Sequence, residues 1–153
     1  MSARNKEVLL WLGRALAIGM VSAVIAFAIR PIAAQNPPDY KPWVAPDDAR
    51  KVKNPLMPTP ENLAAGEQTF MDNCALCHGE KGMGDGPGGK TIKIHPANFT
   101  DPKLMAQETD GSLFWKMSNG RGPMPSWKDT LEEKERWQLV LYIRKLGKDA
   151  AKK

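Results

Sequence analysis

One pentapeptide limits the possible folds of this 153-residue chain more than any other part of it. It has the form C-x-x-C-H, made by Cys74, Cys77 and His78, and it uses both cysteines of the sequence. Two thiols at this spacing share one turn of a helix, where they can add to the two vinyl groups on one edge of a porphyrin. The adjacent imidazole can then bind the iron from the proximal side. The motif therefore predicts one covalently attached haem c.

The same residues allow two other interpretations. A thioredoxin-like redox pair would require a βαβ setting, and no strand pattern flanks the cysteines. A zinc site would need four ligands, whereas the sequence holds only one further histidine, His95. Haem attachment is therefore favoured over both.

The chain opens with an apolar stretch from Val8 to Ile29 that Arg14 interrupts. If Arg14 reaches the membrane interface, the stretch is long enough to cross a bilayer, and the basic residues before it favour a cytoplasmic amino terminus. We expect residues 1–34 to be an uncleaved anchor that crosses the bacterial cytoplasmic membrane once and leaves the rest on the periplasmic side. A cleaved signal sequence and a buried soluble helix are the alternatives.

Prolines crowd the stretch from Pro37 to Pro60, at a density that excludes a continuous helix and favours extended polyproline II. Residues 35–58 are therefore expected to form a linker. The linker is either a spacer that holds the next domain off the bilayer or a strap that lies on a partner subunit through Tyr40 and Trp43.

Residues 59–147 are predicted to form an all-α globular domain, followed by a basic tail, 148–153. Sustained alternation with a period of two residues is absent, so few or no strands are expected. A domain of this size has a small core, which a haem would help to fill.

Start and stop signals mark the helices of this domain. Thr59 is a good N-cap before Pro60, and the first helix runs from there into the haem motif. A second helix follows Asp110 and stops at Gly120. The last one is expected to start at Thr130, with Glu133 completing a capping box, and to end near Gly147.

The candidates for the second axial ligand are Met83, His95, Met105, Met117 and Met124. Met83 lies too close to His78 in sequence, and Met105 and Met117 fall where the core needs apolar residues. Met124 stands between two prolines, which exclude a helix at this position. Its side chain can therefore point toward an iron instead of packing in the core. We predict Met124, with His95 or an open position as alternatives. A thioether opposite an imidazole favours electron transfer over catalysis.

The segment from Gly84 to Thr91 matches the P-loop pattern G-x-x-x-x-G-K-[ST]. A P-loop follows a buried strand and opens a helix, and neither context is present, so no nucleotide is expected. The segment is better read as a compliant loop on the proximal side of the haem. Within it, Pro87 could present its carbonyl to the Nδ1–H of His78.

Taken together, residues 60–147 resemble a class I cytochrome c. In that family a glycine and an aromatic residue on the first helix cross the last helix closely, and Gly66, Phe70 and Tyr142 fit those roles. Four stretches are similar to the mono-haem cytochrome subunit of alternative complex III, a bacterial quinol-oxidising membrane complex: 82–87, 96–100, 110–115 and 120–127. Some such subunits are anchored by a lipidated cysteine, which this chain lacks, so a protein helix would have to replace it.

This resemblance implies an electron carrier rather than an enzyme. It would be a tethered subunit of a respiratory or photosynthetic complex that passes electrons to a terminal oxidase or a periplasmic acceptor. A free-standing tethered or soluble shuttle is the alternative, and a catalytic or sensing haem would require loss of the methionine ligand. No nucleic-acid partner is expected, because residues 35–153 carry 18 basic and 16 acidic side chains.

Three basic residues and one tryptophan each allow more than one role. Lys116, Arg121 and Lys128 form either a basic rim that docks an acidic partner or ordinary solvated charge. Trp127 shields the haem, donates its indole N–H to a propionate, or packs in the core.

Overall fold

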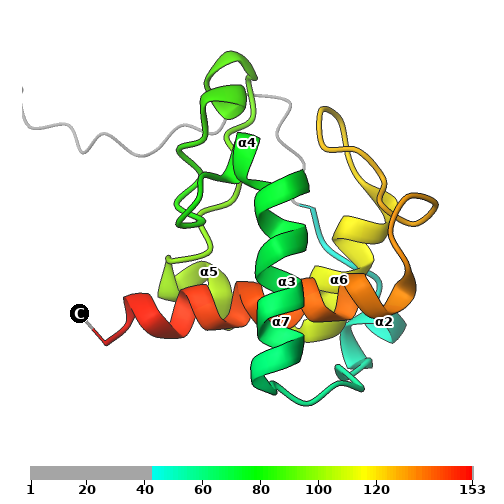
Figure 1. Cartoon of the computed structure of the whole chain (residues 1–153). Helices are drawn as coiled ribbons and strands as arrows, with labels where there is room; N and C mark the ends of the chain where they lie inside the picture. Colours follow the sequence, from blue (N-terminus) through cyan, green and yellow to red (C-terminus); the bar gives the residue numbers. More distant parts are fainter. Residues whose placement is uncertain (1–42, 153) are drawn as a thin grey trace, which may run out of the picture. The chain divides into compact units, whose positions relative to one another are not determined.

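The computed structural model describes residues 43–152, which form helices joined by loops (Figure 1). The helices are α2 (Asp47–Lys51), α3 (Pro60–Asn73), α4 (Ala75–His78), the 3-10 helix η1 (Pro87–Thr91), α5 (Pro102–Gln107), α6 (Asp110–Asn119) and α7 (Glu133–Ala150). Across this range the only β-type pairing is an isolated bridge between Arg121 and Met124. The all-α prediction for the globular part is therefore confirmed.

The expected membrane anchor lies outside the described residues. So does the first part of the linker, including Tyr40. Of the helices within residues 43–152, none combines the length and the apolar character that crossing a bilayer requires.

The centre of the domain is the crossing of α3 and α7 (Figure 1). A Cβ atom on Gly66 would lie 2.2 Å from the backbone oxygen of Gln138, so only glycine lets the two helices approach this closely. One turn further along α3, Phe70 is fully buried, and its ring centroid lies 5.3 Å from that of Tyr142. The close crossing expected from Gly66, Phe70 and Tyr142 is confirmed.

The helix starts follow their capping residues, with one correction. The Thr59 side chain accepts a hydrogen bond from the Asn62 amide at the start of α3, as predicted. The predicted start of α7 at Thr130 is wrong, because the N-cap is Glu132 and its capping-box partner is Glu135. The amides of Thr130 and Leu131 instead close a turn on the carbonyl of Trp127, which delays the helix by two residues.

The end of α7 also differs from the expectation. The helix continues to Ala150, beyond Gly147 and into the residues expected to form the basic tail. The amide of Ala151 reaches back to the carbonyl of Gly147, so this glycine lies within the last turn and does not terminate the helix.

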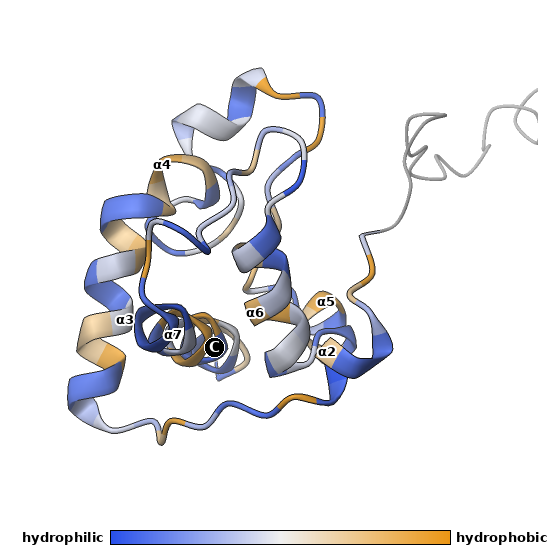
Figure 2. Cartoon of the chain, turned by 90° about the vertical axis from the view of Figure 1, so that its right-hand side faces the viewer, coloured by the Kyte–Doolittle hydropathy of each residue, from blue (hydrophilic) through white to orange (hydrophobic). Residues whose placement is uncertain are grey.

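Residues 43–58, here called the strap, belong to the globular domain. Figure 2 shows the chain passing from α2, beside α6, along one side of the domain to α3. Ala45 is 1% exposed, and the Asn54 side chain donates to the carbonyl of Trp137 at 2.9 Å. A Cβ on Gly111 would lie 2.0 Å from the carbonyl oxygen of Ala49, so α2 touches the backbone of α6.

This part of the expected linker is therefore not a polyproline spacer. No proline lies between Pro46 and Pro55, and that gap leaves room for a short helix. Its acidic first turn, Asp47 and Asp48, and its basic last turn suit the helix dipole.

Candidate haem site

The C-x-x-C-H motif lies where α3 passes into α4. Cys74 joins the two helices, and its carbonyl accepts the amide of His78 at 2.9 Å. Both thiols are free and partly exposed. Burial raises the pKa of the Cys74 thiol to about 12, and the neighbouring Cys77 adds to this shift. The two cysteines thus lie within one helical turn, and the folded protein keeps the Cys74 thiol protonated at physiological pH.

The imidazole of His78 is held by a segment that follows it in sequence. Its Nδ1 lies 3.1 Å from the carbonyl oxygen of Ala97, and its ring stacks on Phe99 with 4.7 Å between centroids. Burial lowers the pKa of His78, and the hydrogen bond to Ala97 opposes this only in part. The ring is therefore neutral at physiological pH, with Nε2 left to bind a metal.

The predicted carbonyl partner of His78, Pro87, is wrong. Pro87 is exposed and opens η1, whereas Ala97 is brought to His78 by a backbone bond from Phe99 to Gly82, 2.7 Å long. Sequence reasoning missed Ala97 and Phe99, and no local signal marks them, because the loop has to fold back before they meet the histidine.

The glycine-rich loop lies against α4. A Cβ on Gly86 would be 2.4 Å from the carbonyl oxygen of Leu76, and one on Gly88 would be 3.3 Å from the Cys77 sulphur. The segment from Gly84 to Thr91 follows α4 and contains η1, so it has neither the strand nor the α-helix of a P-loop. Its glycines permit close contact with the haem motif.

Met124 sits on a tight hairpin. Arg121 and Met124 exchange both backbone hydrogen bonds, at 2.9 and 3.2 Å, around Gly122 and Pro123. Gly122 has a φ of +59°, as the first central residue of a type II′ turn requires. The Met124 side chain is half-buried and packs against the core, so the hairpin presents it to the domain rather than to solvent.

The second arm of this hairpin is fastened to the end of α6. Ser126 donates its hydroxyl to the carbonyl of Ser118 at 2.6 Å, and the amide of Trp127 donates to Met117 at 3.0 Å. The Ser118 hydroxyl in turn accepts from the guanidinium of Arg136 on α7. Met124 is thereby positioned from two helices.

The other candidate ligands have different surroundings. Met105 and Met117 are 9% and 5% exposed and belong to the core, as predicted. Met83 is 49% exposed, and His95 lies exposed on a loop. Trp127 packs against the core, which agrees with the simplest of its three predicted roles.

Two of the three basic residues beside this hairpin contact the strap. Lys116 pairs with Glu108, in an ion pair whose side chains are only 17% and 12% exposed. Its Nζ and the guanidinium of Arg121 both lie over the ring of Trp43. Only Lys128 of the three is exposed, so they do not form a continuous free rim.

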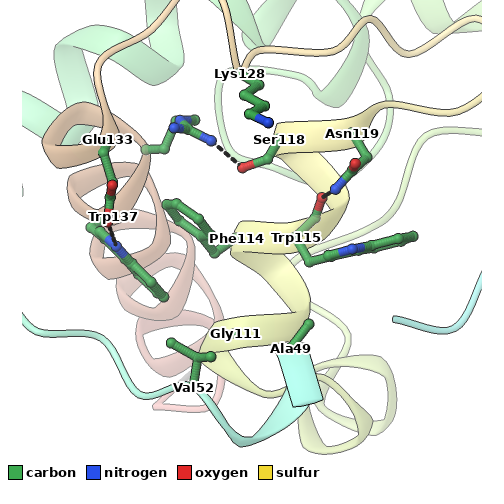
Figure 3. Close-up of a pocket in the computed structure, with 11 residues that line it drawn as sticks. Ala49, Val52, Gly111, Phe114, Trp115, Ser118, Asn119, Lys128, Glu133 and Trp137 are labelled. Carbon is green, nitrogen blue, oxygen red and sulfur yellow. Dashed lines mark hydrogen bonds between the residues drawn. The ribbon is translucent and has the colours of Figure 1, made fainter. Parts of the chain in front are cut away.

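The described part of the domain also carries a groove away from the haem motif. This groove of about 500 Å³ lies between α6, α7 and the strap (Figure 3). The ring of Phe114 stacks on Trp137, with 3.9 Å between centroids (Figure 3). The guanidinium of Arg136 lies 4.8 Å from the centroid of the Phe114 ring. None of the predicted haem-binding residues lines it, so it is separate from the haem site.

The donors present fit a haem c. The motif offers two thiols and an imidazole whose Nδ1 is already engaged, and the hairpin offers a thioether. In Figure 1, α4 stands above α7 near the middle of the domain, and the loop between α6 and α7 lies to its right.

Residues 61–143, more than half of the chain, match the family described as cytochrome C oxidase, cbb3-type, subunit III. The chain belongs to this family. It is a mono-haem class I cytochrome c, and it binds one covalent haem c.

Three known proteins illustrate what this cytochrome c is similar to. It is 35% identical over 95 residues to chloroplastic cytochrome c6 of Chlamydomonas reinhardtii, covering 59% of this chain and 58% of the relative. It is 32% identical over 87 residues to the cbb3-type cytochrome c oxidase subunit FixP of Bradyrhizobium diazoefficiens, covering 56% of this chain and 28% of that subunit. The chain thus spans less than two thirds of either relative.

The third is a solved structure. A chain of the Kuenenia stuttgartiensis reducing HAO-like protein complex superposes with a TM-score of 0.54 at 31% identity, covering 60% of this chain and 46% of that one.

Proposed function

We propose that this cytochrome transfers electrons through a haem c bonded to Cys74 and Cys77 and ligated by His78 and Met124. When bound, the haem supplies a one-electron couple at its iron. The observation that carries the proposal is the bond between His78 Nδ1 and the carbonyl of Ala97, 3.1 Å long. It fixes the tautomer and the ring orientation and leaves Nε2 as the metal-binding atom.

Met124 supplies the second ligand from its pinned hairpin. A thioether opposite an imidazole stabilises the reduced iron and occupies the position that oxygen or peroxide would need. This favours electron transfer over a peroxidase or a gas sensor.

The ligand assignment is tested by Met124→Ala, with Met83→Ala as its control. Met83 is an exposed methionine elsewhere in the chain, so its loss should leave the spectrum unchanged. Met124→Ala should keep the covalent haem, as judged by mass, but lose the near-infrared charge-transfer band of thioether-bound ferric haem and become high-spin. A Met124→Ala variant that retains this band would refute the assignment.

We further propose that the protein is a membrane-tethered subunit of a quinol-oxidising complex such as alternative complex III. In this proposal residues 1–34 anchor it in the bacterial cytoplasmic membrane, the haem domain faces the periplasm, and electrons pass to a terminal oxidase or periplasmic acceptor. Support comes from the sequence stretches described above. Two of the similar proteins are also named as parts of redox assemblies, an oxidase subunit and a protein complex.

This second proposal is tested by haem staining of a native gel run on membranes solubilised in mild detergent. A stained band of several hundred kilodaltons that contains this chain is expected, and mass spectrometry of the band would name the partners. A band near the mass of the chain itself, 16.9 kDa, would instead identify a free-standing shuttle. Recovery of the haem in the soluble fraction would exclude the anchor.

A further inference from the structure

Trp43, near the start of the strap, lies beneath two cations. The Lys116 Nζ is 5.7 Å from the centroid of its ring, and the guanidinium carbon of Arg121 is 6.0 Å from it. Both distances fall within the range of cation–π attraction. The half-buried indole therefore joins the strap to α6 and to the loop that follows α6.

One of these two cations belongs to the Met124 hairpin. Arg121 exchanges both of its backbone hydrogen bonds with Met124, so the two residues form the closed base of the hairpin. A displacement of Arg121 is therefore transmitted directly to the backbone of Met124.

Both arms of the hairpin are joined to α6, the first through the amide of Gly120 and the second through Ser126 and Trp127. Its tip is open, with no atom within 4 Å of a Cβ built on Gly122. The contact between Trp43 and Arg121 lies on the first arm. It adds a side-chain restraint from outside α6 to an arm whose other tie is the backbone bond of Gly120.

Trp43 itself is held in place. Lys116 is fixed by its ion pair with Glu108, and that carboxylate also accepts the Ser112 hydroxyl. On the strap, Ala45 is buried two residues after Trp43, and α2 touches the backbone of α6. The indole is thus a fixed platform rather than a loose side chain.

We propose that Trp43 is a positioning residue for Met124. Its ring, held by the strap against Lys116 and Arg121, restrains the hairpin and keeps the thioether in place. This inference rests on the proposed role of Met124 as the axial ligand.

The test measures how readily Met124 is displaced. Imidazole added to the ferric full-length holoprotein competes with the methionine, so its affinity rises with the population in which Met124 has detached. Two cation–π contacts at a partly exposed site predict roughly fivefold tighter imidazole binding in Trp43→Ala. Trp43→Phe keeps a ring and should stay near the wild type. Val44→Ala, next to Trp43 and 62% exposed, should change nothing.

Arg121→Gln provides an independent route to the same prediction, because it removes the cation and leaves the hairpin backbone intact. It should also tighten imidazole binding, and its effect should not add to that of Trp43→Ala. If Trp43→Ala does not fold, Arg121→Gln and Trp43→Phe still decide the matter: imidazole affinity in Arg121→Gln equal to the wild type would refute the proposal.

Two other outcomes overturn the proposal and can be told apart. A lower urea midpoint for Trp43→Ala with unchanged imidazole affinity would mean that Trp43 only secures the strap. Retention of the thioether band in Met124→Ala would show that the ligand assignment itself is wrong, and the role of Trp43 would fall with it.

Discussion

Replacement of Gly66 by alanine should disrupt the crossing of α3 and α7. The new Cβ would lie 2.2 Å from the oxygen and 2.7 Å from the carbon of the Gln138 carbonyl, and 3.1 Å from the Cβ of Tyr142. Because a comfortable contact is near 3.5 Å, the helices would have to separate by about 1 Å. The atoms that obstruct the methyl group are backbone, so no side-chain rotation can relieve the overlap.

The cost follows from two opposing effects. Overpacking of a core contact costs about 3 kcal/mol when backbone must move, whereas alanine gains about 1 kcal/mol over glycine in helix propensity. We therefore expect Gly66→Ala to lower the free energy of unfolding by about 2 kcal/mol or more. For a domain of this size, that lowers the urea midpoint by about 1 to 2 M.

Gly147→Ala is the matched control. It also places a methyl group on a helical glycine, but the nearest atoms are the Phe99 carbonyl oxygen at 3.1 Å and Met105 Cγ at 3.4 Å. Small shifts relieve such contacts, and the gain in propensity offsets them, so we expect a change of less than about 0.5 kcal/mol. Urea unfolding of both holoproteins, followed by far-ultraviolet circular dichroism, makes the comparison. Equal midpoints for Gly66→Ala and the wild type would refute the close-crossing argument.

Two further predictions concern α7. Arg144→Ala removes donors to Asp110 and to the carbonyls of Met105 and Glu108, so it should lower the free energy of unfolding by about 2 to 3 kcal/mol. Lys145→Ala is the control. It breaks an exposed ion pair and should cost under about 0.5 kcal/mol in the same urea assay. Burial and the nearby Glu67 raise the pKa of Tyr142. As the pH rises, the phenol of the unfolded chain therefore ionises before that of the folded protein. The contribution of Tyr142 to the free energy of unfolding should be complete below about pH 10 and fall above it in the wild type, but not in Tyr142→Phe. Urea midpoints of the two proteins that change in parallel between about pH 9 and 11 would contradict this.

Most of the features that the sequence predicts correctly depend on residues close together in the chain. The C-x-x-C-H motif identifies the haem because the spacing of two thiols and an imidazole lies within one helical turn. Thr59 and Gly120 mark helix ends because capping depends on neighbouring residues. Gly66 could be placed only through the family resemblance, since its role depends on a helix that lies far away in sequence.

The misplaced acceptor for His78 and the misread strap depend on contacts between distant segments. The acceptor comes from Ala97, 19 residues further along, whereas the start of α7 is set by a local turn on the carbonyl of Trp127. The strap resembled a spacer because a high density of prolines shows only that a continuous helix cannot form there. It does not report that Asn54 will find the carbonyl of Trp137, 83 residues away.

The crossing of α3 and α7 also sets an order of events in the making of this protein. Gln138 donates to Asn62 across 76 residues, so the helices that pack most closely, α3 and α7, come from segments far apart in the sequence. Closing so large a loop costs entropy that only the finished contact repays. The crossing therefore cannot form until the last helix has been synthesised.

The thiols pass through two chemical states during this time. In the open chain Cys74 has the pKa of an ordinary exposed thiol and supplies a reactive thiolate, whereas in the closed domain burial raises that pKa to about 12. We therefore expect the thioether bonds to form before α7 docks on α3. On this timetable the two thiols react while the chain is still open, and the docking of α7 on α3 comes afterwards.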